Sequence, residues 1–332
     1  MATTTLEVTT ENTPDTRDHY HCALASSLRY SAYSLKARLD DGSLQARLPL
    51  LLVSSRLFGR FLVSLPYVNS AGVMADNDEA ASKLIDAAVA LADELDVDHL
   101  QLRHEKEIDH PKLTDSIRSK VLMRLSLPET TDELWKSFKP KVRNQVRKGE
   151  KCNLDVHWGN QDRLDDFYTV FARNMRDLGT PVYPKRLFES ILAAFGDDAE
   201  LCVVHKAGRP IAGALLVHQS GRTEVPSASS LRAFNSTNAN MLMYWHLLKR
   251  AVERGQKEFD FGRSTEGSNT YRFKKQWGAQ PHPSVWQYYV RRGSVGDTRP
   301  DSPKYRLAIR VWQKMPVWLA NRIGPPIVRG IP

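Results

Sequence analysis

Cysteine is scarce in this sequence, which has three cysteines among 332 residues. Cys22, Cys152 and Cys202 lie far apart, with no CxxC pair and no histidine at metal-ligand spacing beside them. This spacing argues against a structural zinc site and against a framework of disulfides. We therefore expect no bound metal and cysteine thiols that stay reduced.

Long apolar runs are missing as well. No stretch reaches the ~18 consecutive apolar residues that a membrane-spanning helix requires. Residues 1–18 are rich in threonine and acidic side chains and have no apolar centre, so they predict a disordered tail rather than an export signal. The expected location is the cytoplasm, where the protein can still touch the inner membrane peripherally.

The bulk composition indicates a globular protein with a basic surface. Hydrophobic residues make up 41% of the chain, enough for a sizeable core, and a length of 332 residues favours two domains over one. The formal net charge of +9 favours an anionic partner such as RNA, a phosphate-bearing substrate or an acidic membrane face.

The second half of the chain predicts a regular order of helices and strands. Thr130 and Glu133 form a capping-box pattern, which opens an amphipathic helix that Pro140 kinks or restarts. Two further helices end at Gly179 and Gly196. The predicted strands are 154–157, 201–205, 211–218, 223–228, 258–261 and 285–290, with helices at 241–254 and 271–277.

This order resembles the topology of the GNAT acyltransferases, and a ferredoxin-like or other α+β fold is the alternative. The first half predicts a similar order with fewer elements, namely strands 49–53, 61–65 and 99–103 around a helix over residues 80–95. We therefore expect an α/β (α+β) protein of tandem GNAT-like domains, the first of them degenerate. The expected ranges are 19–130 for the first domain, 131–292 for the second, and 293–332 for a linker and a C-terminal amphipathic helix.

Aromatic and charged residues alternate in the run FDFGRS. A strand here places Phe259 and Phe261 on one face and Asp260 on the other. For these two rings, and for those of Phe273 and Trp277, a place in the hydrophobic core is the favoured interpretation.

Charged residues of the same region are candidates for chemistry. Gly262 lets the chain turn close to a ligand, while Arg263 and Lys274 offer charge to a phosphate or a developing oxyanion. Two interpretations stay open for Asp260, Arg263 and Lys274. They form a functional site if they face a cleft, or they are structural, with Asp260 paired to a neighbouring arginine.

The predicted helix after Pro140 is strongly basic. Lys139, Arg143 and Arg147 fall at successive helical turns, with Lys141 and Lys148 beside them. A face of this kind can bind the phosphates of tRNA, of a nucleotide sugar or of lipid headgroups. The alternative is a solvated positive face that only keeps the protein soluble.

The run DFGRS, followed after a short spacer by YRFKKQWGA, resembles the C-terminal signature of the FemAB/FemX-like acyltransferases. The likeness is greatest to the branch associated with PEP-CTERM and exosortase loci. Similar segments occur at 135–148, 174–183 and 225–230, so the resemblance covers most of the chain from about residue 48.

The resemblance implies a cytoplasmic N-acyltransferase, and we expect it to hold neither a metal nor a bound cofactor. Such an enzyme passes an acyl group, from aminoacyl-tRNA or acyl-CoA, to an amine on a cell-envelope or exopolysaccharide precursor. A nucleotide sugar or a lipid-linked sugar is the expected acceptor, tRNA is a further expected partner, and a monomer is the expected state.

Two departures from relatives bear on the donor. Many GNAT enzymes hold the coenzyme A pyrophosphate with a glycine-rich turn where this chain has residues 232–240, which lack glycine. This argues against a standard acetyl-CoA enzyme. The long coiled coil that some Fem enzymes carry has no counterpart in the sequence pattern, which leaves the tRNA donor open too.

Aminolysis of an ester or thioester needs a neutral amine and donors for the oxyanion, but no enzyme nucleophile. The expected catalytic roles are amine orientation or deprotonation by Asp260, anion stabilisation by Lys274 and Arg263, and proton relay by Tyr244 or Tyr271. The expected substrate contacts are Lys139, Lys141, Arg143, Arg147, Lys148, Arg232 and Asn235.

The C-terminal segment predicts an amphipathic helix that Pro316 interrupts. Its apolar residues, flanked by arginine and lysine, either lie on a membrane or pack back onto the first domain. Two other functions remain open for the whole chain. One is a non-catalytic scaffold of a polysaccharide-export locus, and the other is a nucleic-acid-binding protein that uses the basic helix.

Overall fold

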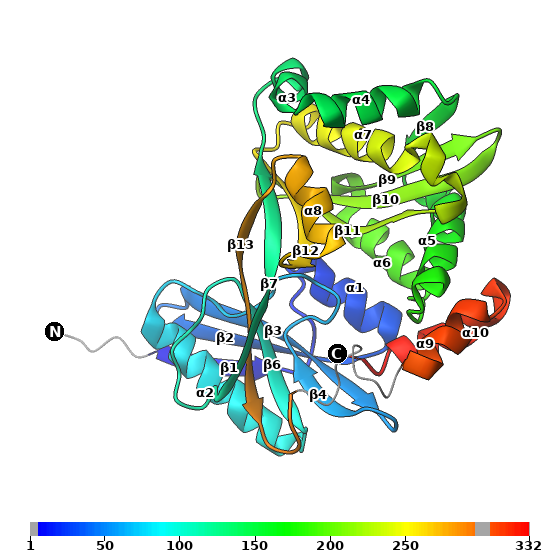
Figure 1. Ribbon diagram of the computed structural model, residues 1–332. Helices are drawn as coiled ribbons and strands as arrows, with labels where there is room; N and C mark the ends of the chain where they lie inside the picture. The colour runs from blue at the N-terminus through cyan, green and yellow to red at the C-terminus, as the bar shows by residue number, and fades with distance from the viewer. Residues whose placement is uncertain (1–5, 296–305, 332) are drawn as a thin grey trace. The chain divides into compact units, whose positions relative to one another are not determined.

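The computed structural model describes residues 6–295 and 306–331, which fold into two compact units (Figure 1). Unit 1 comprises Met1–Ser119, Pro283–Leu307 and Pro325–Pro332, and unit 2 comprises Lys120–His282 and Ala308–Gly324. These ranges differ from the expected 19–130 and 131–292 because strand pairing, not sequence order, decides where each strand belongs.

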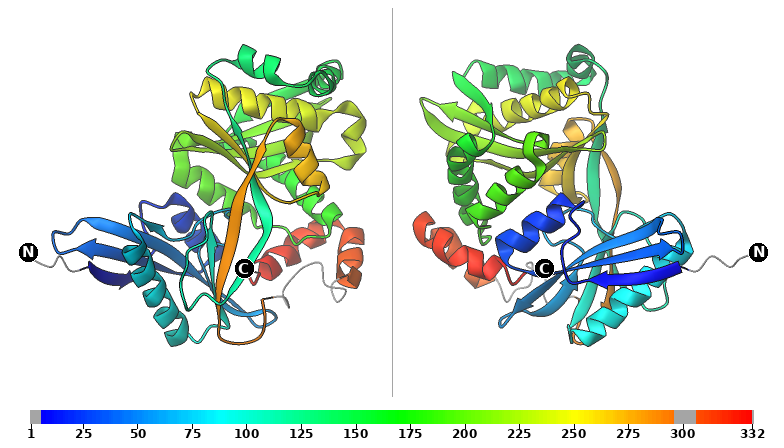
Figure 2. Two further views of the ribbon diagram at one scale, coloured as in Figure 1. Left: turned by 60° about the vertical axis from the view of Figure 1, so that its left-hand side comes forward. Right: turned by 180° about the vertical axis from the view of Figure 1, so that it is seen from behind.

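Unit 1 is a sheet with a helix on each face. Its strand order is β1-β2-β3-β4-β6-β13, and Figure 2 shows α1 and α2 on opposite sides. All these neighbours are antiparallel except β4 and β6. The elements are β1 (Leu6–Glu11), α1 (His19–Leu28), β2 (Ser31–Leu39), β3 (Leu44–Ser55), β4 (Gly59–Val63), β5 (Met74–Ala75), α2 (Asp78–Glu94), β6 (His99–His104) and β13 (Gln280–Val290).

The start of the chain corrects one expectation. Residues 1–18 were expected to form a disordered tail, but Leu6–Glu11 is strand β1, which pairs with β2. Helix α1 was not expected either. The pattern was missed because β1 is an edge strand in which only Leu6 and Val8 pack on the core, so its sequence is mostly polar. Residues 1–5 lie outside the described residues.

Unit 2 is a sheet between two helical layers. Its strand order is β7-β12-β11-β10-β9-β8, with α4 and α7 on one face and α5 and α6 on the other (Figures 1 and 2). The elements are β7 (Asp115–Ser126), α3 (Thr131–Ser137), α4 (Pro140–Glu150), β8 (Leu154–Gly159), α5 (Leu164–Leu178), α6 (Lys185–Phe195), β9 (Ala199–Lys206), β10 (Arg209–Gln219), β11 (Arg222–Ser230), α7 (Ala239–Glu253), β12 (Glu258–Thr265) and α8 (Asn269–Gln276).

Local signals in the sequence explain several of these boundaries. The Thr130 side chain accepts a hydrogen bond from the Glu133 N–H, which confirms the predicted cap. Pro140 restarts the helix, since it occupies the first turn of α4 after α3 has ended. Gly179 ends α5 with a φ of 81°, a left-handed conformation that favours glycine.

Each unit contains the same strand–helix–strand arrangement. In unit 1, α2 connects the parallel strands β4 and β6, and in unit 2, α7 connects the parallel strands β11 and β12. This internal similarity agrees with the expected duplication. Among the described residues, no helix is long and apolar enough to cross a membrane.

A buried polar network attaches α7 to the sheet of unit 2. Glu200 on β9 accepts hydrogen bonds from Arg250 of α7 at 2.8 Å, and its carboxylate lies 3.0 Å from His218 Nε2 on β10. Burial alone raises the pKa of Glu200, but the hydrogen bonds from His218 and Arg250 outweigh it and lower the pKa to about 2.

Replacing Glu200 by glutamine should lower the free energy of unfolding by about 2 kcal/mol or more at neutral pH, because Arg250 loses its buried partner. The folded-state pKa is depressed, so this stabilisation is complete above the ordinary pKa of 4.5 and is lost as the pH falls towards 2. Denaturant titrations of wild type and Glu200→Gln should therefore converge in acid. Glu253→Gln, at an exposed position of α7, is the matched control and should change little.

Candidate functional site

The parallel strands β11 and β12 pair over three residues and then part. The paired positions are Arg222–Glu224 and Glu258–Asp260. Beyond them β11 continues beside β10, from Ser227 to Ser230, and β12 continues beside β7, from Arg263 to Thr265. The two strands therefore form a fork, with Glu224 and Asp260 at its base.

A bulge lies in each strand just beyond the base of the fork. In β11 the register with β10 shifts between Glu224 and Ser227, a stretch that contains Pro226. Proline is tolerated here because a bulge leaves one residue out of the ladder of hydrogen bonds. In β12 the register with β7 shifts between Asp260 and Arg263. Bulges bend strands, so the two together direct β11 and β12 apart.

Polar side chains hold the β12 bulge in place. Asp260 accepts a hydrogen bond from the Gly262 N–H at 2.7 Å and forms a buried ion pair with Arg124 of β7, at 3.0 Å from Nε. The Lys274 amine donates to the carbonyl oxygens of Gly262 at 2.9 Å and Arg263 at 3.0 Å. Gly262 itself has a φ of 78°, which glycine adopts at little cost.

The three charged residues singled out from the sequence thus lie together at the bulge. Both oxygens of Asp260 are engaged, and the arginine pairing left open from the sequence is present as the bond to Arg124. Burial lowers the pKa of Lys274 to about 8, against the opposing attraction of Asp260. Lys274 is therefore a buried amine that can change its charge near neutral pH.

The two candidate tyrosines come from α7 and α8, the helices that precede and follow β12 in the chain. Tyr244 of α7 stacks on Phe261, with 5.7 Å between ring centroids, and burial raises the pKa of its hydroxyl. Tyr271 lies in the first turn of α8, where its N–H donates to the capping Ser268. Both are buried.

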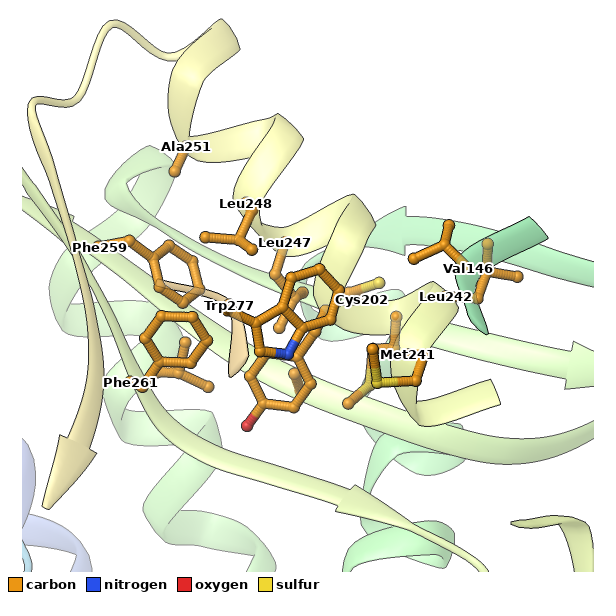
Figure 3. Close-up of a cluster of buried hydrophobic side chains, with 14 of the residues drawn as sticks. Val146, Cys202, Met241, Leu242, Leu247, Leu248, Ala251, Phe259, Phe261 and Trp277 are labelled. Atoms are coloured by element: carbon orange, nitrogen blue, oxygen red, sulfur yellow. The ribbon is translucent and has the colours of Figure 1, made fainter. Parts of the chain in front are cut away.

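The aromatic residues mostly occupy the core, as expected. Phe259, Phe261 and Trp277 are at most 3% exposed and lie together beneath α7 (Figure 3). Phe273 is different, because it is only half-buried and lines a pocket. The core interpretation therefore holds for the first three rings and only partly for Phe273.

This pocket, of about 240 Å³, lies at the start of α7. Its walls come from α4, the end of β11, the 3-10 turn Arg232–Thr237, α7 and α8. Neutral amide side chains and two phenylalanines dominate its lining. The lining residues are Gln145, Ser230, Leu231, Phe234, Asn235, Asn238, Ala239, Asn240, Met241, Phe273 and Gln276.

The pocket offers hydrogen-bond donors from the backbone. The first bond inside helix α7 runs from the Leu242 N–H to the Asn238 carbonyl, at 3.0 Å. The N–H groups of Asn240 and Met241 precede it in the first turn, so they have no helical carbonyl to donate to. Such groups, at the positive end of a helix dipole, favour an anion or a carbonyl oxygen.

Helix α4 forms the opposite wall and packs very closely on α7. A side chain at Gly149 would bring a Cβ within 2.9 Å of Leu242 Cβ, so this contact needs glycine. Gln145 faces the pocket from α4. Its Oε1 is buried and accepts no hydrogen bond within the described part of the chain, which leaves it available to a donor group on a ligand.

The basic residues of α4 lie around this wall rather than inside the pocket. Lys141 and Lys148 are exposed, at four residues before and three after Gln145. Arg147 lies 5.6 Å from the Trp135 ring, and Arg143 is half-buried. The remaining predicted contacts lie as follows: Lys139 is exposed before α4, Arg232 is exposed on the 3-10 turn, and Asn235 lines the pocket.

Sequence patterns did not point to several pocket residues. Gln145 and Gln276 carry no charge, belong to no motif and come from helices far apart in the chain. The available signal was indirect: Gln145 falls inside the basic helix, and Gln276 falls inside the run YRFKKQWGA.

Comparison with known proteins agrees with this geometry. Residues 136–275 match the model of the acetyltransferase (GNAT) domain family. No curated protein matches the chain. Residues 136–275 thus have the fold of a GNAT domain, and the alternative of a ferredoxin-like fold falls away.

Over the described residues, the protein has the fold of tandem GNAT proteins. The crystal structure of FemX is similar over 91% of this chain and 100% of its own, with a TM-score of 0.64 and 17% identity. L-PGS from Bacillus licheniformis is similar over 89% and 92%, with a TM-score of 0.54 and 10% identity. A tandem GNAT protein from the clavulanic acid biosynthesis pathway is similar over 87% and 100%, with a TM-score of 0.52 and 12% identity.

Replacing Lys274 by methionine should destabilise unit 2, because the buried carbonyls of Gly262 and Arg263 lose their donor. The expected loss is about 2 kcal/mol in the free energy of unfolding. Lys275→Met, at the exposed neighbouring position, is the control and should change stability by less than about 0.5 kcal/mol. Equal stabilities of the two variants in urea would contradict the proposed role of Lys274 at the bulge.

Proposed function

We propose that this protein is an N-acyltransferase that passes an acyl or aminoacyl group to an amine on a cell-envelope or exopolysaccharide precursor. The GNAT-type domain at 136–275 supports acyl transfer, and the pocket at the start of α7 is the observation that carries the proposal. FemX shares the fold of both units and supports the extension to aminoacyl donors.

The donor enters between β11 and β12 and reaches the first turn of α7. The fork leaves a stretch of each strand on which a carbonyl-bearing donor can lie, and the N–H groups of Asn240 and Met241 receive its phosphate or carbonyl oxygens. Lys141 and Lys148 add positive charge on the α4 side. Both acyl-CoA and aminoacyl-tRNA carry phosphates, so both fit this chemistry.

The acceptor amine attacks the ester or thioester carbonyl directly. The carbon–nitrogen bond forms, the bond to the leaving oxygen or sulfur breaks, and the amine proton passes to the leaving group. Tyr244 and Tyr271 are the proposed relays for that proton, since Tyr244 packs on Phe261 of β12 and Tyr271 lies in the helix that follows β12. We assign Asp260 to positioning, because its oxygens already hold Gly262 and Arg124.

Lys274 and Arg263 are the proposed source of positive charge for the tetrahedral oxyanion. Lys274 fulfils this role only when protonated. Its pKa is lowered by burial to about 8, so its charged fraction falls as the pH rises through that value.

Turnover should accordingly decline above about pH 8, after correction for ionisation of the acceptor amine. Lys274→Arg, which stays charged, should show a decline shifted to higher pH even if its rate at neutral pH is lower. A pH–rate profile of kcat measures both. An identical profile in wild type and Lys274→Arg would remove Lys274 from the reaction.

A direct test offers purified protein acyl-CoA and aminoacyl-tRNA in parallel, each with amine-bearing nucleotide sugars and envelope precursors. Mass spectrometry should detect an acceptor that gains one acyl group from one of the donors. Asn235→Trp, which fills the pocket, should lower turnover at least about tenfold. Ser236→Trp, at the exposed neighbouring position outside the lining, is the matched control and should remain near wild type.

The outcomes separate the functions. Transfer that survives Asn235→Trp would place the donor elsewhere. No transfer from either donor by folded protein would favour the non-catalytic scaffold. Strongly salt-dependent RNA binding without any acceptor would favour the nucleic-acid-binding function.

A further inference from the structure

Two helices near the C-terminus, α9 (Arg306–Lys314) and α10 (Val317–Val328), carry a surface that acyl transfer does not use. Six large apolar side chains are well exposed in the described part of the chain. Three of the six fall within residues 307–318. They are Leu307, Val311 and Trp318.

The inner side of α9 and of α10 as far as Gly324 is fixed to unit 2, while Pro325–Val328 of α10 belong to unit 1, where Tyr67 donates a hydrogen bond to the Val328 carbonyl. Trp312 is 9% and Ala320 1% exposed. The side chain of Arg176, near the end of α5, donates a hydrogen bond to the Met315 carbonyl at 3.0 Å. The helices therefore present their other side to solvent.

The close fit at both helices supports this orientation. A Cβ at Gly179 would lie 2.5 Å from Ile309 Cγ2, and a Cβ at Gly324 would lie 2.9 Å from the Val182 backbone nitrogen. Both glycines are thus required for the close approach. Rotation of either helix about its axis would break the contact that its glycine permits.

The outer side combines apolar and basic residues. Val311 is 57% and Trp318 67% exposed. Lys314 follows Val311 by three positions and Arg322 follows Trp318 by four, so each helix shows an apolar side chain and a cation on one face. Arg310 is exposed beside them.

The segment that carries this surface has charged residues of one sign only. The sequence from 302 to 332 contains lysine and arginine but neither aspartate nor glutamate. A second copy of the same surface would bring cations against cations, and an RNA would supply phosphates but no apolar phase for Val311. An anionic lipid surface satisfies both requirements at once.

We propose that this surface, defined by Arg310, Val311, Lys314, Trp318 and Arg322, docks on an anionic lipid bilayer. Val311 and Trp318 enter the boundary between headgroups and acyl chains, while the three cations contact headgroup phosphates. Docking brings the protein to acceptors carried in the bilayer. The proposal does not depend on the proposed transferase activity, because vesicle binding requires neither donor nor acceptor.

The test is co-sedimentation of the full chain with vesicles of phosphatidylcholine, with and without phosphatidylglycerol. Wild type should bind the phosphatidylglycerol vesicles and bind pure phosphatidylcholine at least about tenfold more weakly. The double variant Val311→Ser/Trp318→Ser should lose about tenfold or more of the binding. Lys314→Glu/Arg322→Glu should lose the preference for phosphatidylglycerol.

Leu57→Ser is the matched control, because Leu57 is 79% exposed in unit 1, outside this surface. It should bind vesicles like wild type, and all variants should keep the wild-type melting temperature. Unchanged binding by Val311→Ser/Trp318→Ser, or equal binding of wild type to both vesicle types, would overturn the proposal. So would light scattering that shows a wild-type dimer which this double variant abolishes, since a second copy would then cover the surface.

Discussion

The parting of β11 and β12 is the constraint on which the rest of unit 2 depends. Parallel strands are stabilised by the ladder of backbone hydrogen bonds between them. Where β11 and β12 part, this ladder is lost, so other hydrogen bonds must replace it. Asp260 supplies one such bond to the Gly262 N–H, and Lys274 supplies two to neighbouring carbonyls. Arg124 neutralises Asp260 in a buried pair, which removes the cost of an isolated charge.

The same cluster links stability to the proposed chemistry. Lys274 donates hydrogen bonds to two carbonyls in the bulge. Because burial lowers its pKa to about 8, its charge also changes with pH near neutrality. The pocket at the start of α7 is a separate feature, since its lining includes none of Asp260, Arg263 and Lys274. It depends instead on the packing of α4 on α7, which is close at Gly149.

Sequence patterns predicted most of unit 2 because its signals are local. The cap at Thr130, the restart at Pro140 and the alternation of Phe259 and Phe261 each depend on near neighbours. The bulges were not predicted, since a bulge exists only relative to a partner strand. The partner of Asp260 was foreseen as an arginine, but its identity as Arg124 required the pairing of β12 with β7. Of the pocket lining, Asn235 was named from the sequence, whereas Gln145 and Gln276 were missed because their neutral amide side chains form no charge pattern.

The central claim is that the first turn of α7 receives the acyl donor. Its most direct test is a titration of isotope-labelled protein with acyl-CoA and, separately, with an aminoacylated tRNA acceptor arm, followed through the amide NMR signals of Asn240 and Met241. The account predicts that one donor shifts both amide signals, together with the side-chain amides of Gln145 and Gln276. Shifts confined to the exposed basic residues of α4, with these four groups unmoved under both donors, would contradict it.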